Sequence, residues 1–104
     1  MNAGKSTALL QASHNYREGG MATYLITAQL DNRAGKARIA SRIGIGQDAD
    51  TFAPGEDLFA KIAAQLASKA IACVFIDEAQ FLTKVQVWQL ARAVDDLNVP
   101  IMCY

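Results

Sequence analysis

The sequence predicts an α/β domain built on a mostly parallel sheet with helices on both faces. Short segments rich in β-branched and aromatic residues alternate along the chain with longer segments whose apolar residues recur at helical spacing. Two polar motifs, GKST at residues 4–7 and the acidic pair at residues 77–78, flank such elements. In a parallel sheet these are the positions where ligand-binding loops form.

In the first half of the chain we predict a helix, a strand and then a long loop. Lys5 to Glu18 contains helix-forming residues and stops at Gly19-Gly20, and Ala22 to Ala28 reads as a strand. Residues 29–57 contain Asn, Asp, Gly and one Pro with weak periodicity, which predicts a functional loop with room for one short helix. This loop carries four basic residues that either form a solvated surface or contact phosphate: Arg33, Lys36, Arg38 and Arg42.

The second half alternates more regularly. Apolar residues at helical spacing predict a helix over residues 58–70, and residues 71–76 form a hydrophobic strand. A second helix is predicted over residues 84–97, and Pro100 introduces a final strand. We expect Phe59 to lie in the core. The inward face of the second helix is predicted to consist of Val87, Trp88, Ala91 and Val94.

Composition limits the chain to one domain without a strong global charge. The 104 residues are 52% hydrophobic, and ten basic residues balance ten acidic ones, so nothing favours nucleic acid or an anionic membrane as a partner. No apolar run reaches membrane-spanning length. Cys73 and Cys103 lie in apolar strand-like runs, which predicts buried, reduced thiols and a cytoplasmic protein. His14 has no metal-binding neighbours in the sequence and needs no functional role.

The GKST motif has the chemistry of a phosphate-binding loop. Gly4, Lys5 and Ser6 can supply backbone donors, a positive charge and a magnesium-binding hydroxyl, ahead of a helix whose N-terminal end favours anions. The full pattern has a glycine five residues before Gly4 and a strand before that, whereas the sequence begins three residues before Gly4. We therefore expect the leading strand to be missing and Met1 to be an internal methionine.

The hydrophobic run that ends in Asp77 and Glu78 has the chemistry of the second half of a nucleotide site. A buried parallel strand that turns acidic at its carboxyl end opens into an active site. We predict that Asp77 holds magnesium, directly or through water. Glu78 then accepts a proton from an attacking hydroxyl, as in a kinase, or orients a water, as in an ATPase.

Four segments together resemble a known family. MNAGKST, TAQLDNR with the downstream SRIG, VFIDEAQFL and PIMCY resemble the zinc-containing, P-loop thymidine kinases of the cytosol, particularly those of bacteria, over the whole chain. The resemblance implies transfer of the ATP γ-phosphoryl group to the 5′-hydroxyl of thymidine or deoxyuridine. It also implies a P-loop NTPase fold, of which residues 1–104 form a partial kinase domain.

The resemblance implies roles for individual residues. Glu78 is the proton acceptor, Arg33 stabilises the transferred group, and Met1 and Phe81 border the thymine ring. Magnesium is held by Ser6 and Asp77. The residues implied to bind ATP and its metal are Met1, Asn2, Ala3, Gly4, Lys5, Ser6, Thr7, Asp31, Asp77, Glu78, Ala79 and Gln80.

The resemblance also implies features that this sequence does not contain. Family members continue into a zinc lobe with Cys or His ligands and a loop that encloses the nucleoside, so structural zinc is expected only in that missing lobe. The family forms homo-oligomers, and a homotetramer is implied. Two alternatives stay open at this point: a P-loop ATPase or helicase-like motor, and a binding module without enzymatic activity.

Overall fold

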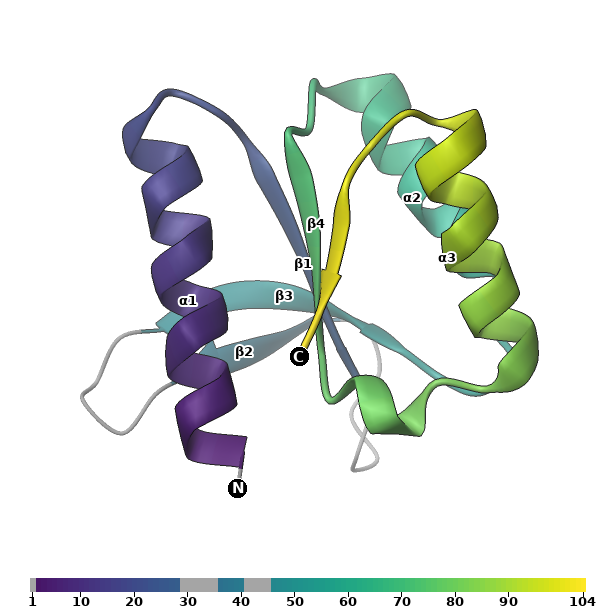
Figure 1. Ribbon diagram of the computed structural model, residues 1–104, viewed down its shortest axis with the longest axis horizontal. Coiled ribbons are helices and arrows are strands. Elements are labelled where there is room, and N and C mark those ends of the chain that lie inside the picture. Colours follow the sequence, from purple (N-terminus) through teal and green to yellow (C-terminus); the bar gives the residue numbers. More distant parts are fainter. Residues whose placement is uncertain (1, 29–35, 41–45) are drawn as a thin grey trace.

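A five-stranded sheet forms the centre of the fold (Figure 1). The computed structural model describes the backbone of residues 2–28, 36–40 and 46–104, and the side chains of residues 7–28 and 49–104. The strands lie in the order β2-β3-β1-β4-β5. Their bounds are β1 (Thr23–Ala28), β2 (Lys36–Ala40), β3 (Gly46–Phe52), β4 (Cys73–Asp77) and β5 (Ile101–Cys103).

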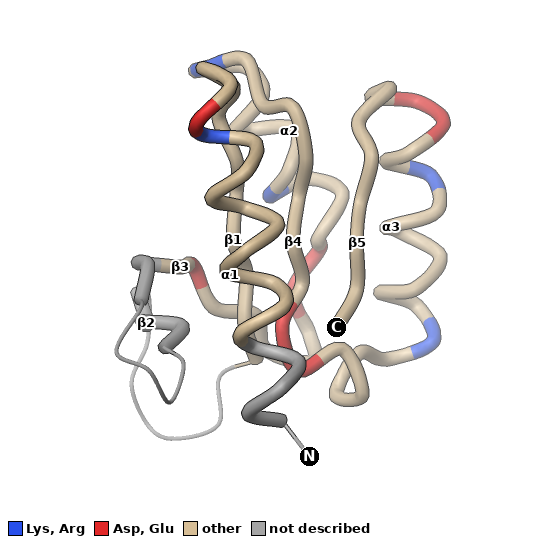
Figure 2. The backbone as a smooth tube through the Cα atoms, turned by 60° about the vertical axis from the view of Figure 1, so that its left-hand side comes forward, with Lys and Arg blue, Asp and Glu red and all other residues tan. Residues whose placement is uncertain are grey.

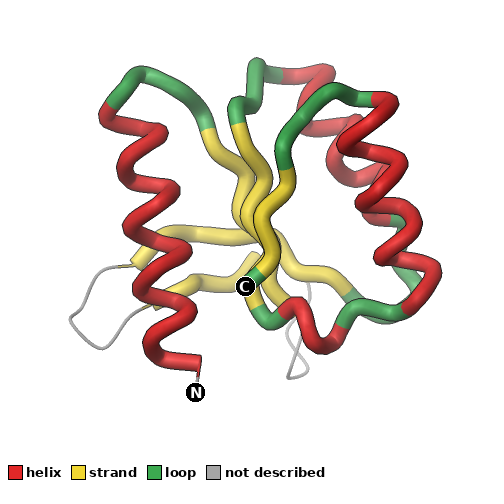
Figure 3. The backbone as a smooth tube through the Cα atoms, in the orientation of Figure 1, coloured by secondary structure: helices red, strands yellow, loops and turns green. Residues whose placement is uncertain are grey.

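The strands are mostly parallel, as predicted. β3, β1, β4 and β5 run parallel to one another, and only β2 at one edge runs antiparallel to its neighbour β3. Helix α1 (Asn2–Glu18) covers one face, while α2 (Leu58–Ser68) and α3 (Lys84–Asp96) cover the other (Figures 1 and 3). Parallel strands covered on both faces are buried on both sides, which explains the continuous hydrophobic run of β4.

The end of α1 follows from its glycines. Gly20 has φ +81, in the left-handed region, and its N–H donates to the carbonyl of Arg17 at 3.0 Å. The Met21 N–H reaches back to the carbonyl of Tyr16, also at 3.0 Å, which completes a Schellman cap. The predicted stop at Gly19-Gly20 is therefore confirmed, and the turn feeds the chain directly into β1.

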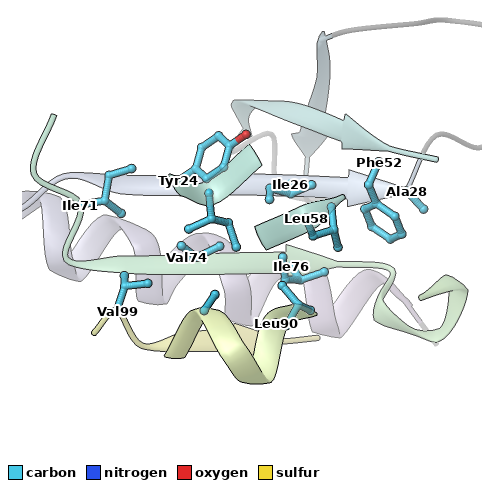
Figure 4. Packing of buried hydrophobic residues seen from close by; sticks show 12 residues of the cluster. Tyr24, Ile26, Ala28, Phe52, Leu58, Ile71, Val74, Ile76, Leu90 and Val99 are labelled. Atoms are coloured by element: carbon cyan, nitrogen blue, oxygen red, sulfur yellow. The ribbon is translucent and has the colours of Figure 1, made fainter. Parts of the chain in front are cut away.

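Two hydrophobic clusters fix the layers. Leu9 and Leu10 of α1 pack on Leu25, Cys73 and Phe75. The larger cluster lies between the sheet and the pair α2 and α3 (Figure 4). Its buried members are Tyr24, Ile26, Ala28, Phe52, Leu58, Ile62, Ile71, Val74, Ile76, Leu90, Ala93 and Val99.

The prediction of a loop over residues 29–57 was wrong, because two strands lie within it. β3 pairs with β1 in parallel, with Ala28 beside Phe52, and β2 folds back on β3. The backbone register sets Lys36 opposite Asp50 and Arg38 opposite Asp48. Polar residues with low strand propensity are held extended here because β3 pairs with β1 along the sheet.

The predicted inward face of α3 was also wrong. The buried residues of this helix are Gln86, Leu90 and Ala93, whereas Trp88 is 71% exposed. Gln86 faces inward because its amide nitrogen donates to the carbonyls of Ala53 at 2.7 Å and Glu56 at 3.2 Å. The predicted inward residues that are exposed instead are Val87, Trp88, Ala91 and Val94.

The two cysteines differ in their surroundings. Both are free thiols, and Cys73 is buried under α1 as predicted. Cys103 is exposed, so the prediction that it is buried was wrong. β5 is short and lies at the edge of the described sheet, with only Ile101 partly packed against the core, so an apolar run there does not guarantee burial. Phe59 packs against the core, as predicted.

Candidate functional site

The carboxyl end of β4 places an acid on the face of the sheet that α1 covers. Side chains alternate along a strand, so Asp77 shares a face with Cys73 and Phe75, which pack under α1. Val74 and Ile76 point to the opposite face, toward α2 and α3. Asp77 is only 9% exposed. A carboxylate is rarely buried without a charged or polar partner, which makes this position a candidate site.

Asp77 belongs to a row of polar residues across three neighbouring strands. Thr27 of β1 is level with Asp77 of β4 on one side and with Thr51 of β3 on the other. All three are buried, with exposed fractions of 8% for Thr27 and 5% for Thr51. Ala49, two residues before Thr51, packs under α1, so the whole row faces α1.

Sequence reasoning missed Thr27 and Thr51. Each is a single threonine in a strand, and threonine is common in strands without any functional role. A signal was nevertheless present for Thr27, because it lies near the end of the first predicted strand, at the edge where parallel sheets bind ligands. The strand that carries Thr51 was read as a loop, so its position in the row was not predictable.

The first turn of α1 lies at the same end of the molecule as the carboxyl end of β4 (Figures 1 and 2). The helix begins at Asn2, earlier than the predicted Lys5, so the backbone of Asn2 to Ser6 is helical. The first four N–H groups of a helix have no acceptor within the helix, and its N-terminal end carries a partial positive charge. With no acidic residue in the first turn, this end suits an anion.

A strained turn follows Asp77. Glu78 has φ 58 and ψ 43, the left-handed backbone conformation that residues other than glycine rarely adopt. The amide nitrogen of Gln80 donates to Oε1 of Glu78 at 2.9 Å. Strain of this kind persists where the surroundings enforce it, and it occurs frequently at active sites.

Hydrogen bonds to the end of the chain hold this turn in place. The N–H of Tyr104 donates to the carbonyl of Ile76 at 2.8 Å, and the N–H of Ala79 donates to the carbonyl of Tyr104 at 3.0 Å. A short 3-10 helix, η1 (Ala79–Phe81), continues from the turn and leaves Phe81 half exposed. The backbone of β5 and Tyr104 thus braces the acidic turn.

The structure brings together one part of the predicted site and does not describe another. Asp77, Glu78, Ala79, Gln80 and Phe81 follow one another through the turn after β4. Thr7, on α1, is partly buried. Met1, Asp31 and Arg33 lie outside the described residues, as do the side chains of residues 2–6.

The remaining polar residues have structural explanations. Burial raises the pKa of the Cys73 thiol, which disfavours the thiolate and leaves it a poor nucleophile. His14 forms an exposed contact with Glu18 at 2.6 Å, one helical turn away. The hydroxyls of Ser13 and Thr23 are 2.9 Å apart and join α1 to β1.

Two kinds of feature are absent from the described residues. No group of three or more His, Cys, Asp or Glu side chains is arranged to hold a metal ion in that part of the chain. None of the helices described is both long and apolar enough to cross a membrane.

Comparison with known proteins gives the family. Residues 1–104 match the family described as TK, thymidine kinase. The chain belongs to the thymidine kinase family. Among curated thymidine kinases, that of Ruegeria pomeroyi is 67% identical over all 104 residues, which cover 52% of its own length. The thymidine kinases of Jannaschia sp. and Agrobacterium fabrum are 66% and 58% identical over the same residues, which cover 53% and 54% of their lengths.

The chain thus spans about half the length of the curated thymidine kinases it matches. The family match covers both the GKST segment and the acidic turn, and it extends through the β2–β3 hairpin that sequence reasoning missed.

Proposed function

We propose that this chain is the nucleotide-binding part of an ATP-dependent thymidine kinase, which transfers the γ-phosphoryl group of ATP to the 5′-hydroxyl of thymidine or deoxyuridine and so makes the monophosphate for nucleoside salvage. One observation carries the proposal most directly. The buried carboxylate of Asp77 lies on the face of the sheet that α1 covers, at the end where that helix begins. An acid and a helix N-terminus in this arrangement are what a magnesium-bound polyphosphate requires.

The phosphates are assigned to the start of α1. The backbone N–H groups of its first turn, from Asn2 to Lys5, supply donors, and Lys5 supplies a positive charge. Ala3 and Gly4 keep bulky side chains away from the anion. Thr7, in the next turn of the helix, is assigned to the nucleotide side by resemblance.

The donor set at the end of β4 fits magnesium. Magnesium prefers oxygen ligands, and Asp77 offers a carboxylate beside Thr27, with Thr51 one strand further along the same row. We assign Asp77 and the Ser6 hydroxyl to hold the ion, with the threonines as polar surroundings for its water. Magnesium held there would supply positive charge to offset that of the phosphates.

Glu78 is assigned as the base. Its carboxylate takes the proton of the attacking 5′-hydroxyl, while the amide of Gln80 holds one carboxylate oxygen in place. The left-handed backbone at Glu78 turns this residue out of the strand that carries Asp77, so the two acids serve different atoms. Phosphoryl transfer needs little covalent chemistry from the protein, so positioning of these groups accounts for most of the catalysis.

The remaining residues of the site are assigned by resemblance, and of these only Phe81 lies in the described part of the chain. We assign Arg33 to the charge that develops on the transferred group and Asp31 to the nucleotide side. Met1 and Phe81 are assigned to the thymine ring, and the half-exposed ring of Phe81 is available for that contact. Arg33→Ala should lower turnover much more than it weakens ATP binding, and equal losses in both would contradict the assignment.

We further infer a cytoplasmic homo-oligomer, a homotetramer by resemblance, without a nucleic-acid or membrane partner. Equal numbers of acidic and basic residues support the absence of a polyanionic partner. The small-molecule partners are thymidine and ATP.

The test uses the chain and a chimera in which the chain replaces the matching half of the Ruegeria pomeroyi thymidine kinase. Magnesium-ATP and thymidine are titrated separately and together by calorimetry, and ADP release is then followed with and without thymidine. Thymidine-dependent ADP release by the chimera, lost in Glu78→Gln, is the expected result. ADP release that does not depend on thymidine would indicate an ATPase instead. The unaltered Ruegeria pomeroyi thymidine kinase is the matched control.

A further inference from the structure

Gln86 is a buried amide on the side of α3 that faces the core. Its side chain is only 1% exposed, and the other buried residues of this helix are Leu90 and Ala93. Glutamine is mostly exposed in folded proteins, because burying an amide costs free energy unless its polar atoms are paired. Here the amide nitrogen donates to two carbonyls and the amide oxygen accepts one N–H. These three bonds reach two separate segments of the chain.

The two segments follow different strands of the sheet. The amide nitrogen of Gln86 donates to the carbonyls of Ala53 at 2.7 Å and Glu56 at 3.2 Å, in the segment after β3. Its Oε1 accepts the N–H of Thr83 at 3.0 Å, in the segment after β4 and η1. Both strands run parallel to β1, so both segments leave the sheet at the edge where the candidate site lies. We call this set of three hydrogen bonds the Gln86 bridge.

The segment after β3 gives the bridge a firm support. Oε1 of Glu56 accepts the N–H of Ala53 at 2.9 Å, and Oε2 of Glu56 pairs with the Lys61 ammonium at 2.9 Å. The same ammonium donates to the carbonyl of Thr51 at 2.6 Å. Since Thr51 belongs to the polar row that includes Asp77, one end of the bridge is fixed to the strands that carry this row.

The other end of the bridge fixes the exit of η1, which leads into α3 (Figure 1). At the entrance of η1, the N–H of Ala79 donates to the carbonyl of Tyr104 at 3.0 Å. At the exit, the N–H of Thr83 is bound by Gln86. Phe81 lies between these two anchors and is half exposed. Its position is therefore set by the anchored backbone on either side more than by packing of its own ring.

We propose that Gln86 is a positioning residue for the nucleoside, because its bridge between the segments after β3 and β4 sets the place of Phe81. The inference rests on the proposed function, in which Phe81 contacts the thymine ring. The bridge lies on the face of the sheet that α2 and α3 cover, whereas α1, to which the ATP phosphates are assigned, covers the other face. Loss of the bridge should therefore weaken the use of thymidine and leave that of ATP nearly unchanged.

Helix capping alone would be a purely structural role for Gln86, and one substitution separates the two roles. Gln86 and Thr83 form a capping box, which uses only the oxygen of the Gln86 side chain. In Gln86→Glu the carboxylate still accepts the Thr83 N–H, but it cannot donate to the carbonyls of Ala53 and Glu56. A buried carboxylate that faces two carbonyl oxygens has a raised pKa, so a proton bound at lower pH restores one donor.

Steady-state kinetics of the chimera test this separation. At about pH 8, Gln86→Glu should raise the KM for thymidine about tenfold and change the KM for ATP less than about twofold. At about pH 6 the KM for thymidine, taken relative to the wild type at the same pH, should fall back toward the wild-type value. Gln86→Met can neither donate nor titrate, so it should raise the KM for thymidine at both pH values.

Gln89→Glu is the matched control. It makes the same change of amide to acid on the same helix, at a residue whose oxygen accepts the N–H of Leu58 at 2.9 Å. A carboxylate keeps that bond, so neither KM should change. Hydrogen exchange of the same proteins gives a readout without substrate. Exchange in residues 53–57 and 79–83 should rise together in Gln86→Glu and Gln86→Met but not in Gln89→Glu.

Three results would overturn the proposal. They are a thymidine KM that Gln86→Glu leaves at the wild-type value, equal rises in the KM for thymidine and for ATP, and unchanged exchange in residues 79–83. Failure of the proposed function looks different, because ADP release by the chimera with the wild-type sequence would then not depend on thymidine. In that case exchange in residues 79–83 still decides whether the bridge holds Phe81.

Discussion

The left-handed backbone at Glu78 predicts an inverted order of stability for two variants. Alanine normally makes a folded protein more stable than glycine does at the same position, because glycine loses more backbone freedom on folding. At φ 58 and ψ 43, however, alanine keeps the strain of a side chain in the left-handed region and glycine does not. Glu78→Gly should therefore be more stable than Glu78→Ala.

The magnitude follows from two opposing terms. Relief of the left-handed strain gives about 1–2 kcal/mol, and the extra freedom of glycine in the unfolded chain costs about 0.5–1 kcal/mol. The difference between the variants is about 0–1.5 kcal/mol in favour of glycine, with a central value of about 0.75 kcal/mol. Both variants lose the hydrogen bond from Gln80, so that loss cancels in the comparison.

Urea unfolding followed by circular dichroism measures the difference, and Ala64→Gly gives the reference. Ala64 is exposed in the middle of α2, where glycine should cost about 1 kcal/mol. If Glu78→Gly is less stable than Glu78→Ala by about the 1 kcal/mol expected for Ala64→Gly, residue 78 is not left-handed in solution and the reasoning fails. Both variants should lose thymidine phosphorylation in the chimera, so the more stable protein would be as inactive as the strained one.

Three further predictions test the positioning, the titration and the packing. Gln80→Ala should lower kcat about tenfold with little change in the KM for ATP, because Glu78 loses one hydrogen bond to its carboxylate. A rise in KM without a fall in kcat, measured by steady-state kinetics, would contradict this prediction. Burial and the hydrogen bond to the carboxylate of Asp50 raise the pKa of Tyr24. The stability that this tyrosine contributes is therefore complete below about pH 10, and above that pH it falls by at most about 1.4 kcal/mol per pH unit. Tyr24→Phe should reduce this slope in urea unfolding measured across that pH range, and an unchanged slope would refute the prediction. Leu90→Ala should cost about 2–5 kcal/mol and Trp88→Ala less than about 0.5 kcal/mol at protein concentrations where the chain is monomeric; equal losses would mean that α3 is rotated.

The elements that the sequence predicted well are those with strong local signals. α1 is stopped by Gly19-Gly20, and β4 is a continuous hydrophobic run that turns acidic at Asp77. Glycine caps and buried parallel strands depend mainly on residues within the element itself. The amino-acid pattern alone therefore suffices to place the candidate acids at the correct end of the correct strand.

The hairpin of β2 and β3 could not be predicted in this way. The β3 sequence contains Gly46, Asp48 and Asp50, which local propensity assigns to turns. Its extended shape comes from pairing with β1 and from contacts such as the hydrogen bond from the Tyr24 hydroxyl to Asp50, 26 residues away in sequence. The alignment of Thr51 with Asp77 depends on this pairing, so part of the candidate site was hidden for the same reason.

Helix α3 shows why periodicity alone cannot orient a helix with apolar residues on both sides. The pattern identified Val87, Trp88 and Val94 correctly as a stripe and assigned it to the core. Gln86 decides the orientation, because its amide nitrogen donates to carbonyls in the segment after β3, and this contact requires Gln86 to face inward. The stripe that periodicity found is then left on the outside. The ring of Trp88 is 71% exposed and adds little to the core, so the inward bonds of Gln86 outweigh the burial that the opposite orientation would give this ring.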